Sequence, residues 1–158
     1  MMPRIAILTP DPADEAFHSR WRDVFERNAE PLRDAGLVVG DRSWGDAEDL
    51  AGFDLVLPLL VWGYVRAYDR WIEKVAEWEQ AGVRLQNPPS VMRWNADKSY
   101  LGTLSERGAP VVPALYVDRV TPGVMAEAAR AFAETSTNAP VLCSLETGNA
   151  LIADNAKL

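Results

Sequence analysis

The sequence predicts an α/β fold in which a mostly parallel sheet is flanked by helices. Three observations lead to this prediction. Short apolar runs alternate with amphipathic segments, glycines stand where the amphipathic segments end, and the run at 53–61 is nearly unbroken in apolar residues. Strands alternating with helices are typical of βαβ units, and a continuously apolar strand suits a sheet that is covered on both faces.

The first strand is predicted over Arg4–Thr9 (RIAILT), and the Pro10-Asp11-Pro12 that follows must be a loop because proline cannot continue a strand ladder. A helix is predicted from Ser19 to a stop at Gly36, since its apolar residues recur at the spacing of one buried stripe. Those residues are Trp21, Val24, Phe25, Asn28 or Ala29, and Leu32. Pro31 is expected to kink this helix or to end its regular part.

A second strand is predicted over Leu37–Val39 and a third within Phe53–Val61, where Pro58 should end the regular ladder. The clearest helix follows and stops at Ala81-Gly82. Its apolar side comprises Tyr68, Trp71, Ile72, Val75 and Trp78. A short strand at Val83–Leu85 completes a small Rossmann-like domain, which needs right-handed crossovers between parallel strands.

Ligands of such open sheets bind beyond the carboxyl ends of the strands. In this chain those ends are the loops that begin at Thr9 and at Trp62. No G-x-G-x-x-G follows the first strand, so the fingerprint of dinucleotide binding is missing. The sequence therefore predicts where a ligand binds but does not name a dinucleotide as that ligand.

Charge and hydropathy exclude some classes of partner. The formal net charge is -7 and the 16 Lys and Arg residues are dispersed, which argues against nucleic acid because phosphate neutralisation needs clustered cations. No apolar run approaches the roughly 20 residues that span a bilayer. The opening MMPRIAILTPDPADE becomes acidic before a signal peptide could develop, so we expect a cytoplasmic protein without a membrane partner.

The stretch NPPSVMRWNADKSYL at 87–101 predicts two short helices. Asn87 can cap the first, with Pro88 at its first position, and Asn95 can cap the second, which ends at Gly108. Lys98 would then lie in the first turn of the second helix, where the helix dipole opposes a cation by roughly a few tenths of a kcal/mol. The residues alone allow two interpretations: Lys98 is solvated, or it binds an anionic partner.

The order of elements over Val83–Pro113 resembles the opening segment of ATP-grasp enzymes of the glutathione synthetase and ribosomal-protein-modifying ligase type. The shared features are a strand ending in Asn-Pro, a short helix, Asp97-Lys98, a helix ending at Gly108 and an apolar strand with prolines. The resemblance covers roughly residues 4–135. It implies a pre-ATP-grasp domain at 1–88 and, at 89–158, the beginning of an ATP-grasp α+β domain.

In activity, the resemblance implies a ligase that transfers phosphate from ATP to a carboxylate and lets an amine or a thiol displace it. Its cofactors would be ATP and Mg²⁺, and its partners small-molecule carboxylate and amine substrates. Lys98 matches the first of the family's two nucleotide-contacting lysines, where an ammonium group holds ATP phosphate. Thr9, Asp11, Trp62 and Tyr64 stand at strand ends where family members bind the acceptor substrate. No catalytic residue and no metal ligand is assigned.

The chain departs from the family pattern from about residue 135. Cys143 and Ser144 stand where the second lysine and a proline are expected, and the family's magnesium ligands belong to a later domain. We therefore expect a truncated or frame-altered ligase that is not competent as this chain alone. The alternative is a non-catalytic α/β binding or interaction module. Self-association is also expected, because the strand at Val141–Cys143 would be a poorly paired edge.

Overall fold

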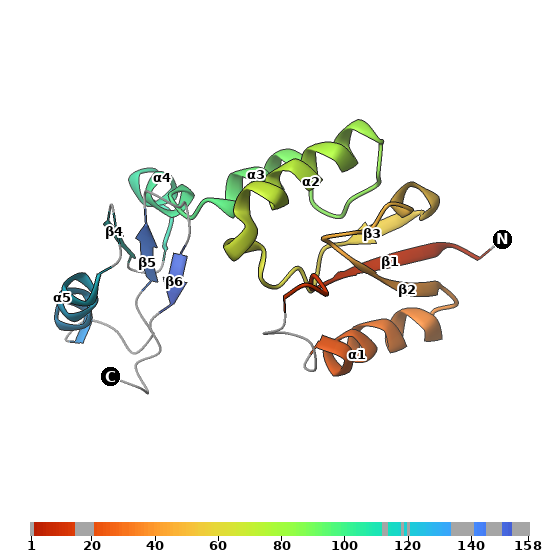
Figure 1. Cartoon of the computed structure of the whole chain (residues 1–158), viewed down its shortest axis with the longest axis horizontal. Helices are drawn as coiled ribbons and strands as arrows, with labels where there is room; N and C mark the ends of the chain where they lie inside the picture. The colour runs from red at the N-terminus through yellow and green to blue at the C-terminus, as the bar shows by residue number, and fades with distance from the viewer. Residues whose placement is uncertain are drawn as a thin grey trace. The chain divides into compact units, whose positions relative to one another are not determined.

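The computed structural model of the chain describes residues 2–14, 21–111, 114–117, 119, 121–133, 141–144 and 150–152. The chain forms two compact units, Met1–Arg93 and Trp94–Leu158, each with its own three-stranded sheet (Figure 1). Strands and helices alternate in both units. The predicted α/β class is confirmed.

The sheet of the first unit is parallel throughout, with β1 in the centre and the order β2-β1-β3. Its strands are β1 (Arg4–Thr9), β2 (Val38–Ser43) and β3 (Leu55–Leu57). In the centre of β1, Ala6, Ile7 and Leu8 are fully buried, as expected for a strand covered on both faces. The predicted parallel sheet is therefore confirmed.

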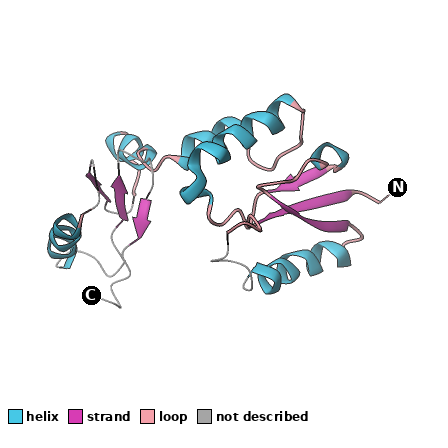
Figure 2. Ribbon diagram, viewed as in Figure 1, coloured by secondary structure: helices cyan, strands magenta, loops and turns pink. Residues whose placement is uncertain are grey.

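Helix α1 (Trp21–Asp34) covers one face of this sheet and α2 (Tyr68–Gln80) lies over the other (Figure 2). On the α1 side, Phe25 and Ala29 pack with Ile7 and Leu60 in one buried cluster. This is the apolar stripe that the spacing predicts. Pro31 does not end the helix, because α1 continues to Asp34; the predicted start at Ser19 lies outside the described residues.

Tryptophans build the core on the α2 side. The ring of Trp71 lies 5.7 Å from Trp44, 5.8 Å from Trp78 and 5.3 Å from Tyr64, measured between centroids. The contacts with Trp44 and Trp78 are edge-to-face, a geometry that the ring quadrupole favours. The same contacts fix η3 (Tyr64–Ala67), a short 3₁₀ helix that leads into α2.

Two strand predictions need correction, and one is confirmed. β3 ends at Leu57, directly before Pro58, as predicted. The second strand is longer than predicted and runs to Ser43, because pairing with β1 carries the ladder through polar residues that sequence preference disfavours. Residues 83–85 are not a strand but form a single parallel bridge between Leu85 and Val56. This segment lies between two residues with left-handed backbone, Gly82 at a φ of 67° and Asn87 at 72°.

The helices after Gln86 also differ from the prediction. Asn87 has a positive φ of 72°, so it is not the extended N-cap that was expected, and α3 (Pro89–Ala96) begins one residue later than predicted. Asn95 lies in the last turn of α3 rather than at the start of a new helix. The next helix, α4, spans Tyr100–Glu106 and ends near Gly108 as predicted.

The second unit contains α4, β4 (Ala114–Val117), α5 (Pro122–Ala133), β5 (Val141–Ser144) and β6 (Ala150–Ile152). Its strand order is β4-β5-β6, with β5 parallel to β4 and antiparallel to β6. The prediction that Val141–Cys143 is an unpaired edge is therefore wrong, since β5 is central. An unpaired strand edge therefore no longer supports self-association, which stays a prediction.

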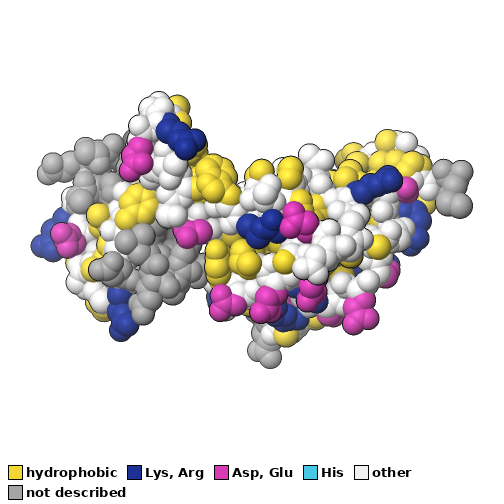
Figure 3. Space-filling model, turned by 90° about the horizontal axis from the view of Figure 1, so that it is seen from above, with side chains coloured by type: hydrophobic (Ala, Val, Ile, Leu, Met, Phe, Trp, Pro, Cys, Tyr) yellow, Lys and Arg dark blue, Asp and Glu magenta, His cyan; other side chains and the backbone are white. Residues whose placement is uncertain are grey.

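Two surface properties bear on the partners. On the face shown in Figure 3, Lys and Arg side chains are interspersed with acidic ones and form no continuous basic tract. Within the part of the chain that the structure describes, the helices are too short or too polar to cross a membrane.

Candidate functional site

A cavity of about 440 Å³ opens at the carboxyl ends of β1 and β2, where open parallel sheets usually bind ligands. The register pairs Thr9 with Ser43, and both residues line it. The complete lining is Thr9, Pro10, Pro12, Trp21, Arg22, Asp41 and Ser43. The cavity thus lies between the strand ends and the first turn of α1.

The lining combines several kinds of polar group with the apolar side chains of Pro10, Pro12 and Trp21. Arg22 supplies a guanidinium group that stacks 4.5 Å from the ring centroid of Trp21, and Asp41 supplies a carboxylate. Hydroxyl groups come from Thr9, which is buried, and from Ser43, whose Oγ accepts the Gly45 N–H at 3.1 Å. A cation, an anion and hydroxyls around one small cavity suit a small polar molecule.

Asp11 is buried beside this cavity and joins the loop after β1 to α2. Its Oδ1 accepts the N–H of Ala13 at 2.9 Å, and its Oδ2 accepts a hydrogen bond from Nη1 of Arg70 on α2. The Nη2 of Arg70 donates to the carbonyl of Gly45 at 2.6 Å. One guanidinium group therefore links three segments: the loop after β1, the loop after β2 and α2.

Gly45 allows this approach because it has no side chain. A Cβ at this position would overlap the carboxyl group of Asp11 and would lie 2.9 Å from Nη2 of Arg70. Any larger residue would have to displace a buried carboxylate and its cation. Glycine at position 45 is therefore a steric requirement of the Asp11–Arg70 ion pair.

A second ion pair joins the same loops. Asp14, three residues after Asp11, pairs with Arg66 in η3. Because Arg66 and Arg70 are four residues apart in adjoining helical segments, both can face the loop after β1. This loop is thus held at two points by the segment that precedes and begins α2.

The structure places the four predicted substrate-binding residues in different settings. Thr9 lines the cavity, whereas Asp11 lies next to it in the ion pair with Arg70. Trp62 packs against the α1-side core, and its carbonyl accepts the Nε1–H of Trp44 at 3.2 Å. Tyr64 packs against Trp71. The cavity lining includes only Thr9 of these four, and the substrate contacts of the others stay predictions.

Lys98, the predicted nucleotide-contacting residue, lies between α3 and α4. Its Nζ donates to the carbonyl of Asn95 at 2.6 Å and lies 5.6 Å from the ring centroid of Tyr100. Lys98 is not in the first turn of the second helix, where the sequence predicts it. It lies two residues after the end of α3, whose dipole favours a cation there, and one residue before Ser99, the N-cap of α4, whose dipole opposes it. A contact with ATP phosphate stays a prediction.

A metal site was not assigned from the sequence. Within the described residues, no three His, Cys, Asp or Glu side chains are grouped closely enough to hold a metal ion. Mg²⁺ that is bound together with ATP commonly takes only one or two carboxylates besides the phosphates, so a Mg²⁺ site stays a prediction.

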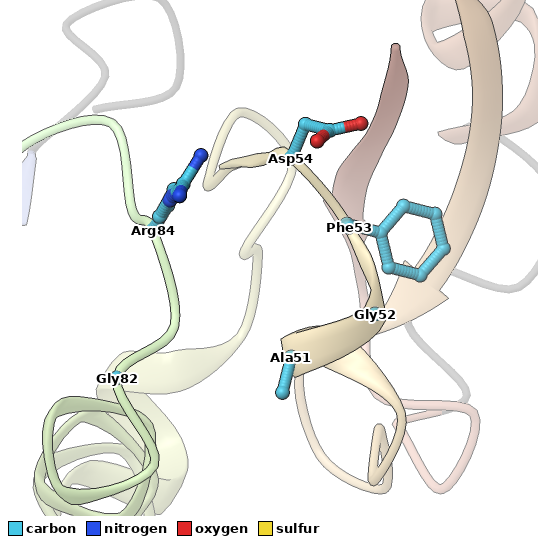
Figure 4. A pocket seen from close by; sticks show the side chains of 6 residues that line it. All are labelled: Ala51, Gly52, Phe53, Asp54, Gly82 and Arg84. Carbon is cyan, nitrogen blue, oxygen red and sulfur yellow. The ribbon is translucent and has the colours of Figure 1, made fainter. Parts of the chain in front are cut away.

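A second hollow, of about 290 Å³, lies at the amino end of β3 (Figure 4). Its charged side chains are Asp54 and Arg84, while the ring of Phe53 points away from Arg84. The Oδ2 of Asp54 already accepts the backbone N–H of Arg4 at 2.7 Å. Because this hollow is at the edge opposite to the usual ligand edge of a parallel sheet, the cavity at Thr9 is the better candidate site.

Sequence reasoning missed most of the residues that shape the candidate site. Arg22, Asp41 and Ser43 were not singled out because isolated polar residues usually face solvent. A correct length for β2 would have found Ser43, since it is the register partner of Thr9. No local signal marks Arg70 or Gly45, whose partners are distant in the sequence.

Comparisons with known proteins relate the first unit to a known family. The family model described as D-cycloserine synthetase DcsG, N-terminal domain, matches residues 5–87, which is more than half of the chain and includes the whole cavity lining. A comparison with curated proteins gives no match.

A solved structure, the crystal structure of D-cycloserine synthetase DcsG, matches with a TM-score of 0.54 and 23% sequence identity. The match covers 70% of this chain and 35% of the DcsG chain, so this chain corresponds to about a third of that synthetase. At this identity the structure supports the fold, and the family model supports the relationship to a ligase that the sequence suggests. The chain therefore belongs to the family defined by the N-terminal domain of the D-cycloserine synthetase DcsG.

Proposed function

We propose that this chain supplies the small-molecule-binding, N-terminal part of an ATP-grasp ligase that joins a carboxylate to an amine or a thiol. The observation that carries the proposal is that one family match, to the N-terminal domain of a synthetase, spans the unit whose strand ends form the cavity. The related synthetase is named for D-cycloserine, a small polar molecule. A ligand of that size suits a cavity of about 440 Å³.

The cavity lining supports a charged organic substrate. The guanidinium group of Arg22 matches a carboxylate, which it can bind through two parallel N–H donors. The carboxylate of Asp41 matches an ammonium group, and Thr9 and Ser43 can exchange hydrogen bonds with hydroxyl or carbonyl groups. We infer that the cavity holds one of the two molecules that the ligase joins.

ATP, in such a ligase, supplies the phosphoryl group that activates the carboxylate. The ammonium group of Lys98 can hold a phosphate oxygen as a point charge. Cys143 also stands where the family resemblance expects the second lysine. We therefore propose that this chain binds substrate and does not complete phosphoryl transfer by itself.

The residue at this position, Cys143 in place of a lysine, also favours a second candidate, a binding or interaction module that keeps the scaffold without the chemistry. A titration with a fluorescent ATP analogue separates the candidates. Magnesium-dependent binding that Lys98→Met abolishes would support the ligase part, with Lys74→Met on α2 as the control for loss of a lysine. No binding at millimolar nucleotide would leave only the binding module.

The cavity is tested by following backbone amide resonances while D-cycloserine is added, alongside simple carboxylates and amines as probes. We expect shifts at the amides of Thr9, Arg22 and Ser43, and we expect them to vanish in Arg22→Gln. Arg27→Gln is the matched control, because Arg27 lies on the same helix and donates its Nε–H to the carbonyl of Asp23. If none of these probes shifts the cavity amides, the proposed substrate site is wrong.

A further inference from the structure

We propose that Arg70 is the positioning residue of the cavity: by binding Asp11 and Gly45 at once, it sets the separation of the loops that extend from Thr9 and Ser43. The inference rests on the proposed function of the cavity. It assigns a role to a helix residue that does not line the cavity and that no sequence pattern singles out.

The backbone shows where this positioning is needed. The β1–β2 ladder ends at the Thr9–Ser43 pair, and the N–H of Trp44 still donates to the carbonyl of Thr9 at 3.1 Å. Beyond this hydrogen bond, the segments that follow β1 and β2 leave the sheet. Arg70 then binds both segments. It contacts Gly45, one residue after Trp44, and Asp11, two residues after Thr9. Arg70 therefore joins the two loops directly at the point where the ladder has ended.

An arginine suits this task because its guanidinium group is a planar fork. Nη1 meets the carboxylate of Asp11 while Nη2 meets the carbonyl of Gly45, so the distance between the two loops is fixed by the geometry of one rigid group. The group also lies 5.6 Å from the ring centroid of Trp44, which is buried. A lysine keeps the charge but cannot place two donors in this arrangement.

The same contacts change the interpretation of Asp11, which the sequence suggested as a substrate contact. Both of its carboxylate oxygens have partners within the protein: Oδ1 accepts from the N–H of Ala13 and Oδ2 from Arg70. Its side chain is only 8% exposed. We infer that Asp11 acts through Arg70 and shapes the cavity without touching the ligand.

The first test measures amide hydrogen exchange in the ligand-free protein, so it does not depend on the proposed function. In Arg70→Gln, the amides of Ala13 and Trp44 should exchange about tenfold faster or more, because a charge-assisted link between the loops is lost. In Arg70→Lys, the Ala13 amide should stay protected through the remaining ion pair while the Trp44 amide loses protection. Unchanged exchange of both amides in Arg70→Gln would overturn the proposal.

The second test is a double-mutant cycle on the affinity for D-cycloserine. Asp11→Asn and Arg70→Gln should each weaken binding about tenfold, and the double variant should bind no more weakly than either, because both changes break one unit. Additive losses of about a hundredfold would show that Asp11 touches the ligand independently, which would overturn its assigned role.

A control variant separates positioning from general destabilisation. Arg66→Gln removes the neighbouring ion pair with Asp14 and should lower the thermal midpoint less than Arg70→Gln does, because this pair is more exposed. Its affinity for D-cycloserine should be unchanged; an equal loss of affinity in Arg66→Gln would refute a specific role for Arg70. If the wild-type protein binds neither D-cycloserine nor the carboxylate and amine probes, the proposed substrate site is wrong, and the exchange measurement alone decides the role of Arg70.

Discussion

The ammonium group of Lys98 donates a hydrogen bond of 2.6 Å to the backbone carbonyl of Asn95, in the last turn of α3. The final carbonyls of a helix lack partners within the helix, and the helix dipole places partial negative charge on them. Lys98 satisfies one of these carbonyls with a cation. The residue therefore has a structural role that is independent of any nucleotide.

Replacing Lys98 by Met should reduce the free energy of unfolding by about 0.5 kcal/mol, because a helix end loses a charged partner in an exposed position. Lys98→Arg should retain most of this contribution, since it keeps the cation. Urea denaturation followed by circular dichroism measures both. Equal stability of the Met variant and the wild type would show that the hydrogen bond contributes nothing, and the nucleotide role would then be the better explanation of the residue.

The parts of the fold that the sequence predicts well are those with a strong repeating pattern. β1 is apolar from Ile5 to Leu8, and the stripe of α2 recurs through Trp71, Val75 and Trp78, so their bounds agree closely with the prediction. The prediction is wrong where a tertiary contact overrides local preference. β2 continues through polar residues because it pairs with β1, and α3 continues through Asn95, which looked like a cap.

The candidate site is less predictable because its contacts join residues that are distant in the chain. Arg70 lies 59 residues after Asp11 and 25 residues after Gly45. No local spacing reports such a junction. The general rule for parallel sheets predicts the ligand edge, and thus Thr9, but the guanidinium group that holds the neighbouring loops follows only from the folded structure.

Asn87 is the described non-glycine residue with a positive φ, at 72°. Asparagine tolerates this region better than most residues, but glycine has no Cβ to strain there. Asn87→Gly should leave stability unchanged or raise it slightly, whereas Asn87→Ala should cost about 1 kcal/mol. Chemical denaturation of the three proteins measures the differences. Equal stability of the Ala variant would mean that residue 87 adopts a different backbone conformation in solution.

The pH dependence of stability should include a contribution from Asp49. Arg42 donates from Nε and Nη2 to both oxygens of Asp49, and these hydrogen bonds hold the pKa of the Asp49 carboxyl below its usual value. A carboxyl whose pKa is lower in the folded state stabilises the fold above its unfolded pKa, near 3.9, and the contribution is lost as pH falls through the folded pKa. The effect is small because the Asp49 side chain is more than half exposed.

The difference in unfolding free energy between wild type and Asp49→Asn, measured from pH 2 to 7, checks this prediction. The difference should be constant above the unfolded pKa and should shrink below about pH 4, and added salt should reduce it throughout. A difference that grows as the pH falls would contradict the assignment. Arg33→Gln, which removes a comparable exposed ion pair with Glu26, is a suitable control for the general effect of surface charge.

Two glycines in the same part of the first unit give a matched test of the Asp11–Arg70 ion pair. A Cβ at Gly45 would overlap the Asp11 carboxyl group, whereas a Cβ at Gly40 would meet the Arg42 side chain at 3.5 Å, an ordinary contact. Gly45→Ala should therefore reduce the unfolding free energy by about 1–3 kcal/mol, and Gly40→Ala should change it by less than about 1 kcal/mol in either direction.

Urea denaturation measures the stability of both variants, and amide exchange at Ala13 shows where Gly45→Ala acts. The Ala13 N–H binds the same carboxyl group that the new methyl group would displace, so its exchange should accelerate in Gly45→Ala and stay unchanged in Gly40→Ala. Equal and small effects of the two substitutions would mean that Asp11 and Gly45 do not approach each other in solution. Because that approach brings Arg70 to both loops, the proposed positioning role would fail with it.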